Sequence, residues 1–131
     1  MIIQLDFDGT LVNFNYPLVG NLNLGCKEVV AELFERGHTI HLNTYRANIS
    51  TIDLENALEF LKNNELMHCI SVVNSQKKLP PTWDIDAAIE LNELFLDDDS
   101  DGIPLKWDHT GKMKMVDWRV VKSLLKQKQI I

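Results

Sequence analysis

Two carboxylates stand two residues apart near the start of the chain, directly after the apolar run 1–5. Asp6 and Asp8 are followed at once by Gly9 and Thr10. Because residues i and i+2 of an extended strand point to the same side, both acids should emerge together where the strand ends, and the glycine lets the backbone turn sharply. This pattern is suited to a site for a divalent metal ion and a phosphoryl group.

Other polar groups follow later apolar segments. Thr44 and Arg46 come after the second predicted strand, the pair Lys77-Lys78 lies in a later loop, and the acids 97–101 follow the fourth strand. In an open parallel sheet the carboxyl ends of the strands form the crevice where ligands bind. We therefore expect these groups to converge on one site.

Apolar runs that alternate with helical patterns predict the elements that position these groups. They indicate a single α/β domain over residues 1–131, a Rossmann-like three-layer sandwich with a mainly parallel sheet. Strands are expected at 1–5, 38–43, 69–73 and 93–96, and helices at 26–36, from about 50 onward, at 84–91 and at 116–128. Thr82 and Asp117 are the expected caps of the last two helices, and a short edge strand is expected after residue 97.

The formal net charge of −6 is distributed unevenly. Residues 1–104 hold 6 Lys or Arg against 17 Asp or Glu, while residues 105–131 hold 7 against 2. The basic tail is either the solvated face of an amphipathic helix or a surface that meets an anionic substrate or partner.

Nothing in the chain resembles a membrane span or an export signal, because the apolar runs are short. The two cysteines, Cys26 and Cys69, are expected to be buried free thiols in a reducing compartment. A cytoplasmic protein without a membrane partner is the expectation.

The order of these motifs resembles that of the haloacid-dehalogenase-like (HAD) hydrolase superfamily. Residues 6–10 (Asp-Phe-Asp-Gly-Thr) match its first motif, Thr44 its second, and Asp97 with Asp98 its fourth, so the resemblance covers about residues 1–104. A receiver domain also combines acids, a hydroxyl and a lysine, but its phosphorylated aspartate lies on a later strand. The intervals between the motifs leave no room for a cap domain, so the resemblance implies a small capless member with an open site.

The resemblance implies roles for the acids. Asp6 would be the nucleophile that forms an aspartyl-phosphate, and Asp8 the general acid and base. Mg²⁺ would be held by the Asp6 side chain, the Asp8 backbone carbonyl and Asp97, with Asp98 as the next choice. Without a cation, clustered carboxylates would repel a phosphate, and this ligand set suits Mg²⁺.

The remaining site residues follow from the same resemblance. Thr44 would donate its hydroxyl to a phosphoryl oxygen, and Gly9 and Thr10 are assigned to substrate binding. Arg46 either grips a substrate anion or pairs with an acid. The family also needs a lysine beside the phosphoryl group. Lys78, closer to a Pro-Pro turn, is favoured for it, and Lys77 is the alternative, assigned to substrate binding.

Together these features predict a Mg²⁺-dependent phosphomonoester hydrolase. Its substrate would be a phosphorylated small molecule, such as a nucleotide, or a nucleic-acid end. The open site could be covered by a flap formed by residues 13–24 or by a neighbouring subunit of a homo-oligomer. The alternative is a catalytically weak HAD-like domain that binds a phosphorylated ligand or a protein partner.

Overall fold

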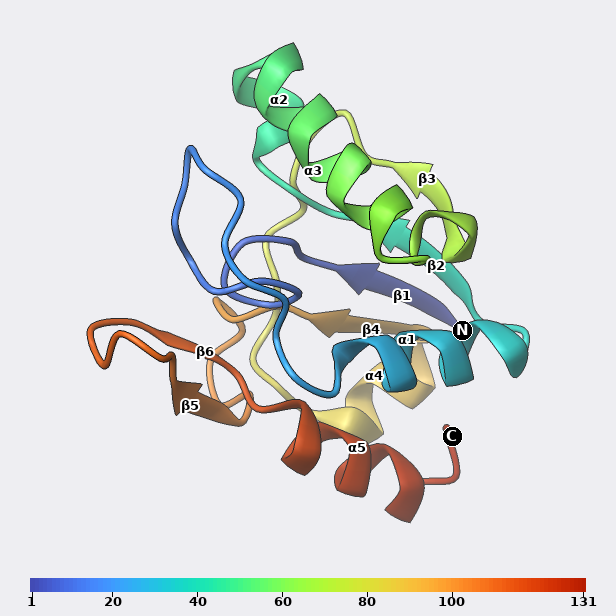
Figure 1. Ribbon diagram of the computed structural model, residues 1–131. Coiled ribbons are helices and arrows are strands. Elements are labelled where there is room, and N and C mark those ends of the chain that lie inside the picture. Colours follow the sequence, from blue (N-terminus) through green and yellow to red (C-terminus); the bar gives the residue numbers. More distant parts are fainter.

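A four-stranded parallel sheet forms the centre of the molecule in the computed structural model, which describes all residues 1–131 (Figure 1). Its strands are β1 (Ile2–Leu5), β2 (Thr39–Leu42), β3 (Ile70–Val73) and β4 (Glu93–Leu96). They run parallel in the order β3-β2-β1-β4. Because β1 is central, the chain that leaves it emerges between the segments that follow β2 and β4. The predicted α/β class and all four predicted strands are confirmed.

Helices flank the sheet. They are α1 (Cys26–Glu35), α2 (Arg46–Ile49), α3 (Thr51–Asn63), α4 (Ile85–Leu91) and α5 (Trp118–Gln127), with a 3₁₀ turn η1 (Met67–Cys69) before β3. In Figure 1, α1, α3 and α5 lie on the near side of the sheet and α4 lies behind it. The sequence offers Ser50 or Thr51 as the cap of α3, and in the structure the Ser50 side chain caps it by accepting from the Asp53 amide. The helix α2 and the turn η1 were absent from the sequence prediction.

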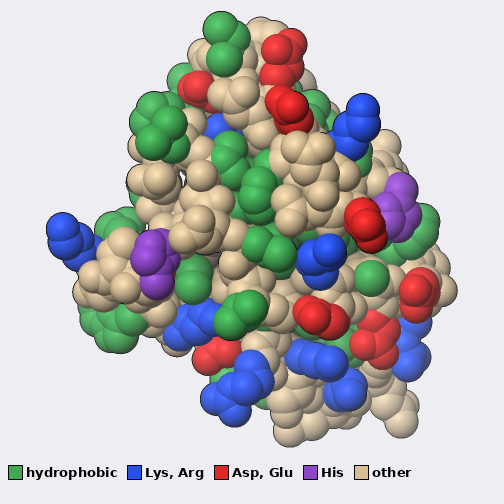
Figure 2. All heavy atoms as spheres, in the orientation of Figure 1, with side chains coloured by type: hydrophobic (Ala, Val, Ile, Leu, Met, Phe, Trp, Pro, Cys, Tyr) green, Lys and Arg blue, Asp and Glu red, His purple; other side chains and the backbone are tan.

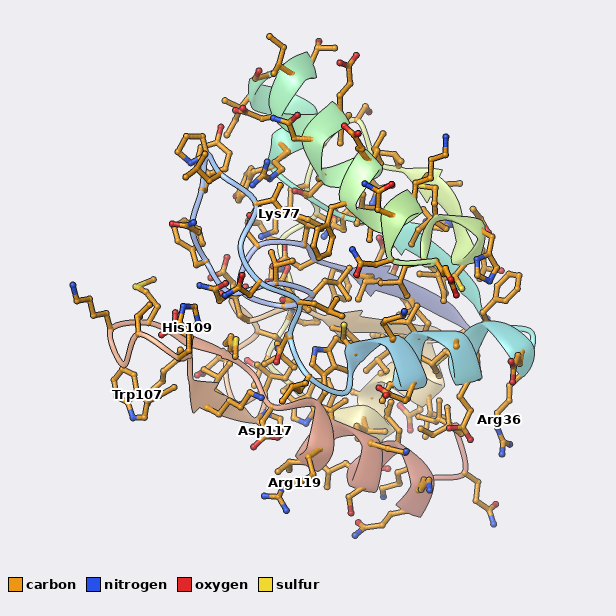
Figure 3. All side chains as sticks on the ribbon, viewed as in Figure 1. Arg36, Lys77, Trp107, His109, Asp117 and Arg119 are labelled. Atoms are coloured by element: carbon orange, nitrogen blue, oxygen red, sulfur yellow. The ribbon has the colours of Figure 1, made fainter.

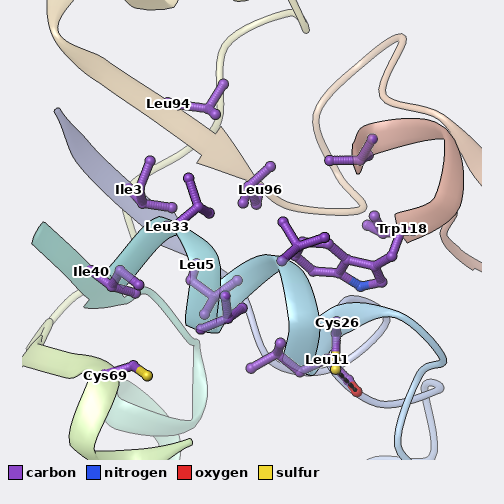
Figure 4. Close-up of a cluster of buried hydrophobic side chains, with 14 of the residues drawn as sticks. Ile3, Leu5, Leu11, Cys26, Leu33, Ile40, Cys69, Leu94, Leu96 and Trp118 are labelled. Carbon is purple, nitrogen blue, oxygen red and sulfur yellow. Dashed lines mark hydrogen bonds between the residues drawn. The ribbon is translucent and has the colours of Figure 1, made fainter. Parts of the chain in front are cut away.

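The strand register places apolar side chains of the central strands on one face of the sheet. Ile3 lies beside Ile40 and Leu94, and Leu5 lies beside Leu42 and Leu96. All of them are buried in one hydrophobic cluster with α1 and α5 (Figure 4).

Trp118 extends this cluster to the loop after β1. Its side chain is fully buried. Its indole N–H donates to the Thr10 carbonyl at 2.8 Å, so α5 supports the loop that carries the first acids.

Two local predictions were wrong. The cap of α4 is Asp84, whose Oδ1 accepts from the Ala87 amide at 3.0 Å, while Thr82 lies too far before the helix to reach it. The expected edge strand after residue 97 is instead a separate antiparallel hairpin, β5 (Leu105–Trp107) with β6 (Lys114–Val116). The cap of α5 is Asp117, as predicted.

Most basic residues of the tail lie on this hairpin and on α5, and Lys and Arg side chains gather over α5 in Figure 2. Both cysteines are free and buried, as predicted. None of the helices combines the length and apolar character that crossing a membrane requires.

Candidate functional site

Three carboxylates meet at the carboxyl ends of β1 and β4. One oxygen from each of Asp6, Asp97 and Asp98 lies within 4.8 Å of the others. The hydrogen-bond ladder between β1 and β4 brings these residues together. It continues past the ends of the strands, because the Asp6 amide donates to the Leu96 carbonyl at 3.0 Å. Asp97 Oδ2 is buried and accepts no hydrogen bond from the protein. Three hard oxygen donors, one of which accepts no hydrogen bond and has the Lys77 ammonium 3.5 Å away, fit a small divalent cation.

Burial changes the proton affinity of this cluster. It raises the pKa of Asp6 well above its usual value, and the neighbouring Asp97 charge raises it further. Burial likewise raises the pKa of Asp97, and that of Asp98 to about 6. Like charges in a poorly solvated place favour the neutral forms, so a cation and protons compete for these oxygens.

Lys77 provides the ammonium group of the site. Its Nζ lies 3.3 Å from Asp6 Oδ1, 3.5 Å from Asp97 Oδ2 and 3.4 Å from Asp99 Oδ2, and its side chain is almost fully buried. Burial alone would lower the pKa of Lys77, but the three carboxylates raise it, so the group stays charged. In Figure 3, Lys77 lies beside the flap at the carboxyl ends of the strands.

Lys78, the lysine favoured from the sequence, lies elsewhere. Its half-exposed side chain reaches Glu93 at 3.3 Å, and it does not line the cavity that contains Lys77. In the folded chain Lys77 faces the acids, whereas Lys78 is turned toward Glu93. The shorter distance of Lys78 from the Pro-Pro turn was therefore a poor guide to which lysine faces the acids.

Asn43 holds the lysine loop in place, a role that we did not predict. Its Oδ1 accepts from the Lys78 amide at 2.7 Å, and its Nδ2 donates to the Lys78 carbonyl at 2.9 Å. Asn74 donates to the same Oδ1 at 3.1 Å. Asn43 is buried, so these bonds satisfy its amide and fix the backbone next to Lys77. The sequence feature that could have indicated this role is the polar amide of Asn43, which stands directly between an apolar strand and Thr44.

Arg46 pairs with an acid, one of its two expected roles. Its Nε and Nη2 donate to Asp8 Oδ2 and Oδ1, both at 2.8 Å. Nη1 and Nη2 also donate to backbone carbonyls of the flap and of α3, those of Pro17, Leu18 and Asp53. All five guanidinium N–H groups therefore have protein partners, and none is left for a substrate anion.

Asp8 consequently lies apart from the three-acid cluster. Its carboxylate is held by Arg46 and adds no oxygen to the group of Asp6, Asp97 and Asp98. Asp8 still lines the same cavity as Asp6. Its assignment to a metal through the backbone carbonyl stays a prediction.

The two hydroxyl residues differ in what they can offer a ligand. Thr44 Oγ1 accepts from the Arg46 amide at 3.2 Å, donates to no protein group and lines the cavity. Thr10 Oγ1 donates to Asp6 Oδ2 at 3.0 Å and accepts from the Asp98 amide at 3.2 Å. Thr10 is fully buried, so its side chain joins the two acid-bearing loops and does not face a substrate.

Gly9 is required by the close approach of Asp98. Its φ is +82°, and a Cβ at this position would lie 2.3 Å from Asp98 Oδ2. We expect Gly9→Ala to displace Asp98, to weaken Mg²⁺ binding at least tenfold and to cost about 1–2 kcal/mol of stability from backbone strain. Isothermal titration with Mg²⁺ and thermal unfolding would measure the two effects.

Gly37→Ala is the matched control, because Gly37 has a φ of +87° but nothing within 4 Å of an added Cβ. It should lose similar stability and keep its metal affinity. Wild-type metal binding in Gly9→Ala would contradict the role of Gly9.

These groups open into one cavity of about 230 Å³. Residues 13–24 form the predicted flap beside it, closed at its base where the Asn13 amide donates to the Asn21 carbonyl at 3.0 Å. The cavity is lined by Asp6, Asp8, Phe14, Tyr16, Thr44, Tyr45, Arg46, Ile49, Lys77, Asp98 and Asp99. The predicted site residues Asp6, Asp8, Thr44, Arg46, Lys77 and Asp98 thus share one cavity.

Comparison of the chain with protein-family models, with curated proteins and with solved structures found no match. The function of the site is therefore inferred from its own residues.

Proposed function

We propose that the protein is a Mg²⁺-dependent phosphomonoester hydrolase that works through an aspartyl-phosphate on Asp6. The observation that carries this proposal is the environment of Asp6. Its carboxylate contacts the Lys77 ammonium at 3.3 Å and groups with Asp97 and Asp98 at the edge of an open cavity. The motif order that resembles HAD hydrolases supports the same reaction.

The residues of the cavity account for both halves of the reaction. An Asp6 oxygen attacks phosphorus, the bond to the leaving-group oxygen breaks, and Asp8 supplies the proton that this oxygen takes. Water then attacks the phosphorus, Asp8 takes its proton, and the bond between Asp6 and phosphorus breaks to release phosphate. Thr44 donates its free hydroxyl proton to a phosphoryl oxygen, and Lys77 offsets the charge on that group.

Mg²⁺ would be held by Asp6, Asp97 and Asp98. The buried Asp97 Oδ2, which accepts no hydrogen bond and pairs with Lys77 at 3.5 Å, supports this assignment. The ion would supply positive charge that offsets the charge of the carboxylates and of the phosphoryl group.

The cavity favours a small phosphorylated substrate over a nucleic-acid end. Arg46 and Lys77 are the only basic residues that line it, and both are engaged by carboxylates. None of the seven basic residues of the tail reaches the lining.

One observation favours the alternative, a catalytically weak HAD-like domain that binds a phosphorylated ligand. Both Asp8 oxygens accept hydrogen bonds from Arg46, so Asp8 can deliver a proton only if this pair opens. A protein in which the pair never opens would bind the phosphoryl group without turnover.

An assay with 4-nitrophenyl phosphate and a panel of phosphomonoesters separates the two functions. We expect hydrolysis with Mg²⁺, its loss after chelation by EDTA, and its return when Mg²⁺ is added back. Calorimetry should show Mg²⁺ binding under the same conditions. If Mg²⁺ binds but no ester in the panel is hydrolysed, the hydrolase is excluded and the binding domain is favoured.

A further inference from the structure

Large apolar side chains surround the mouth of the site. Phe14 and Tyr45 line the cavity although they are 45% and 46% exposed, and Ile49, which is more exposed, lies beside them. Figure 2 shows hydrophobic side chains over the flap and over α2. Single exposed apolar residues need no explanation, but several around one cavity above an acidic cluster indicate a ligand with an apolar part.

The aromatic walls come from two segments that are fastened together. Phe14 and Tyr16 belong to the flap, whereas Tyr45 directly precedes α2. The Tyr16 hydroxyl donates to the Asp53 side chain, and Arg46 binds flap carbonyls while its guanidinium lies 5.0 Å from the centre of the Tyr16 ring. The walls are therefore held in position before a ligand arrives, which lowers the entropy lost on binding.

The polar groups of the cavity adjoin its aromatic wall. Thr44 and Lys77, the groups proposed to bind the phosphoryl group, line the cavity together with the acids. The Lys77 ammonium also lies 4.7 Å from the centre of the Tyr45 ring. No N–H of Arg46 is free to bind a second anionic group on the substrate. A leaving group with its own charge would find no partner here, whereas an uncharged planar ring would contact aromatic side chains.

We propose that the substrate is a nucleoside monophosphate whose base lies against Phe14 and Tyr45, an inference that rests on the proposed phosphatase. The cavity of about 230 Å³ is smaller than typical ligand pockets of about 300–1,000 Å³, so the phosphoryl group and the sugar would fill it and the base would lie at its mouth, where Phe14 and Tyr45 are half exposed. Stacking tolerates any base, because every base has a π-face. The site therefore selects a nucleoside without selecting the base.

Turnover measurements test this proposal. We expect the wild type to hydrolyse AMP and UMP with a kcat/KM at least tenfold above that for glycerol 3-phosphate. Phe14→Ala and Tyr45→Ala should each reduce this ratio about tenfold, since stacking on one aromatic side chain contributes that much or more per base. Trp107→Ala is the matched control, because Trp107 is exposed on the β5–β6 hairpin outside the cavity, and it should keep the ratio.

Binding measurements separate failure of this inference from failure of the phosphatase. In the Asp6→Asn protein with Mg²⁺, AMP should bind at least tenfold tighter than inorganic phosphate, and Phe14→Ala should remove the difference. Equal affinity, or equal turnover of AMP and glycerol 3-phosphate, would overturn the nucleoside proposal even where the phosphatase stands. A homodimer that Phe14→Asp dissociates would also overturn it, because the mouth would then be a subunit interface.

Discussion

Asp6→Asn is expected to abolish phosphomonoester hydrolysis, with a loss of about 10⁴-fold or more in kcat, as for loss of a nucleophile in other enzymes. The amide has nearly the shape of the carboxylate but cannot form the aspartyl-phosphate. The loss should therefore appear in kcat for every substrate, and no increase in substrate concentration should restore it. Quenched reactions of the wild type should show phosphate bound covalently to Asp6, and those of the variant should not.

The same substitution should stabilise the metal-free protein at neutral pH. Burial and the Asp97 charge raise the pKa of Asp6 in the folded state above its value in the unfolded chain. The folded wild type is therefore favoured at low pH and loses stability as the pH rises through that raised pKa. Asparagine carries no charge, so the variant avoids this loss. In EDTA we expect a Tm a few degrees above the wild type at pH 8, since about 1 kcal/mol shifts the Tm of such a domain by about 4 °C, and a smaller difference at pH 5.

Asp86→Asn makes the same chemical change at an exposed carboxylate that pairs with Lys128 on the surface. It should keep both the activity and the wild-type dependence of stability on pH. Substantial turnover by Asp6→Asn would refute the nucleophile assignment. A variant that is less stable than the wild type in EDTA at pH 8 would show that the Asp6 charge is compensated in the fold.

Sequence patterns were sufficient where local chemistry decides the structure. The run before Asp6 forms the central strand, and residues 93–96, three of them apolar, form its neighbour, so Asp6 and Asp97 meet as parallel pairing requires. The cap Asp117 was likewise readable, because an aspartate directly before a helical pattern supplies the acceptor that the first turn lacks.

The sequence did not determine which partner a side chain contacts where two partners were equally possible. Arg46 was equally suited to a substrate anion or to an acid, and only the folded chain brings Asp8, the flap and α3 around it. Lys77 and Lys78 are identical in type and adjacent, so no local pattern separates them. What separates them is Asn43, which lies more than thirty residues earlier and binds the backbone of Lys78.

Whether Lys77 or Lys78 serves the site can be tested directly with a matched pair of substitutions. Lys77→Met should lower kcat/KM about 10²–10³-fold, the usual effect of removing one group that stabilises transition-state charge. It should also reduce the stability of the metal-free protein, because Asp6, Asp97 and Asp99 then face one another without a cation. Mg²⁺ should restore part of this stability but not the activity, since the ammonium group that faces the phosphoryl group is still missing.

Lys78→Met removes the same ammonium group one residue later. Its side chain makes one exposed contact with Glu93, so we expect kcat/KM within about twofold of the wild type. Steady-state kinetics and thermal unfolding with and without Mg²⁺ compare the two variants. Equal losses in both would mean that the loop rearranges during the reaction and that Asn43 does not fix it. Full activity in Lys77→Met would remove the lysine from the mechanism and leave Thr44 and the metal ion as the groups that stabilise the phosphoryl charge.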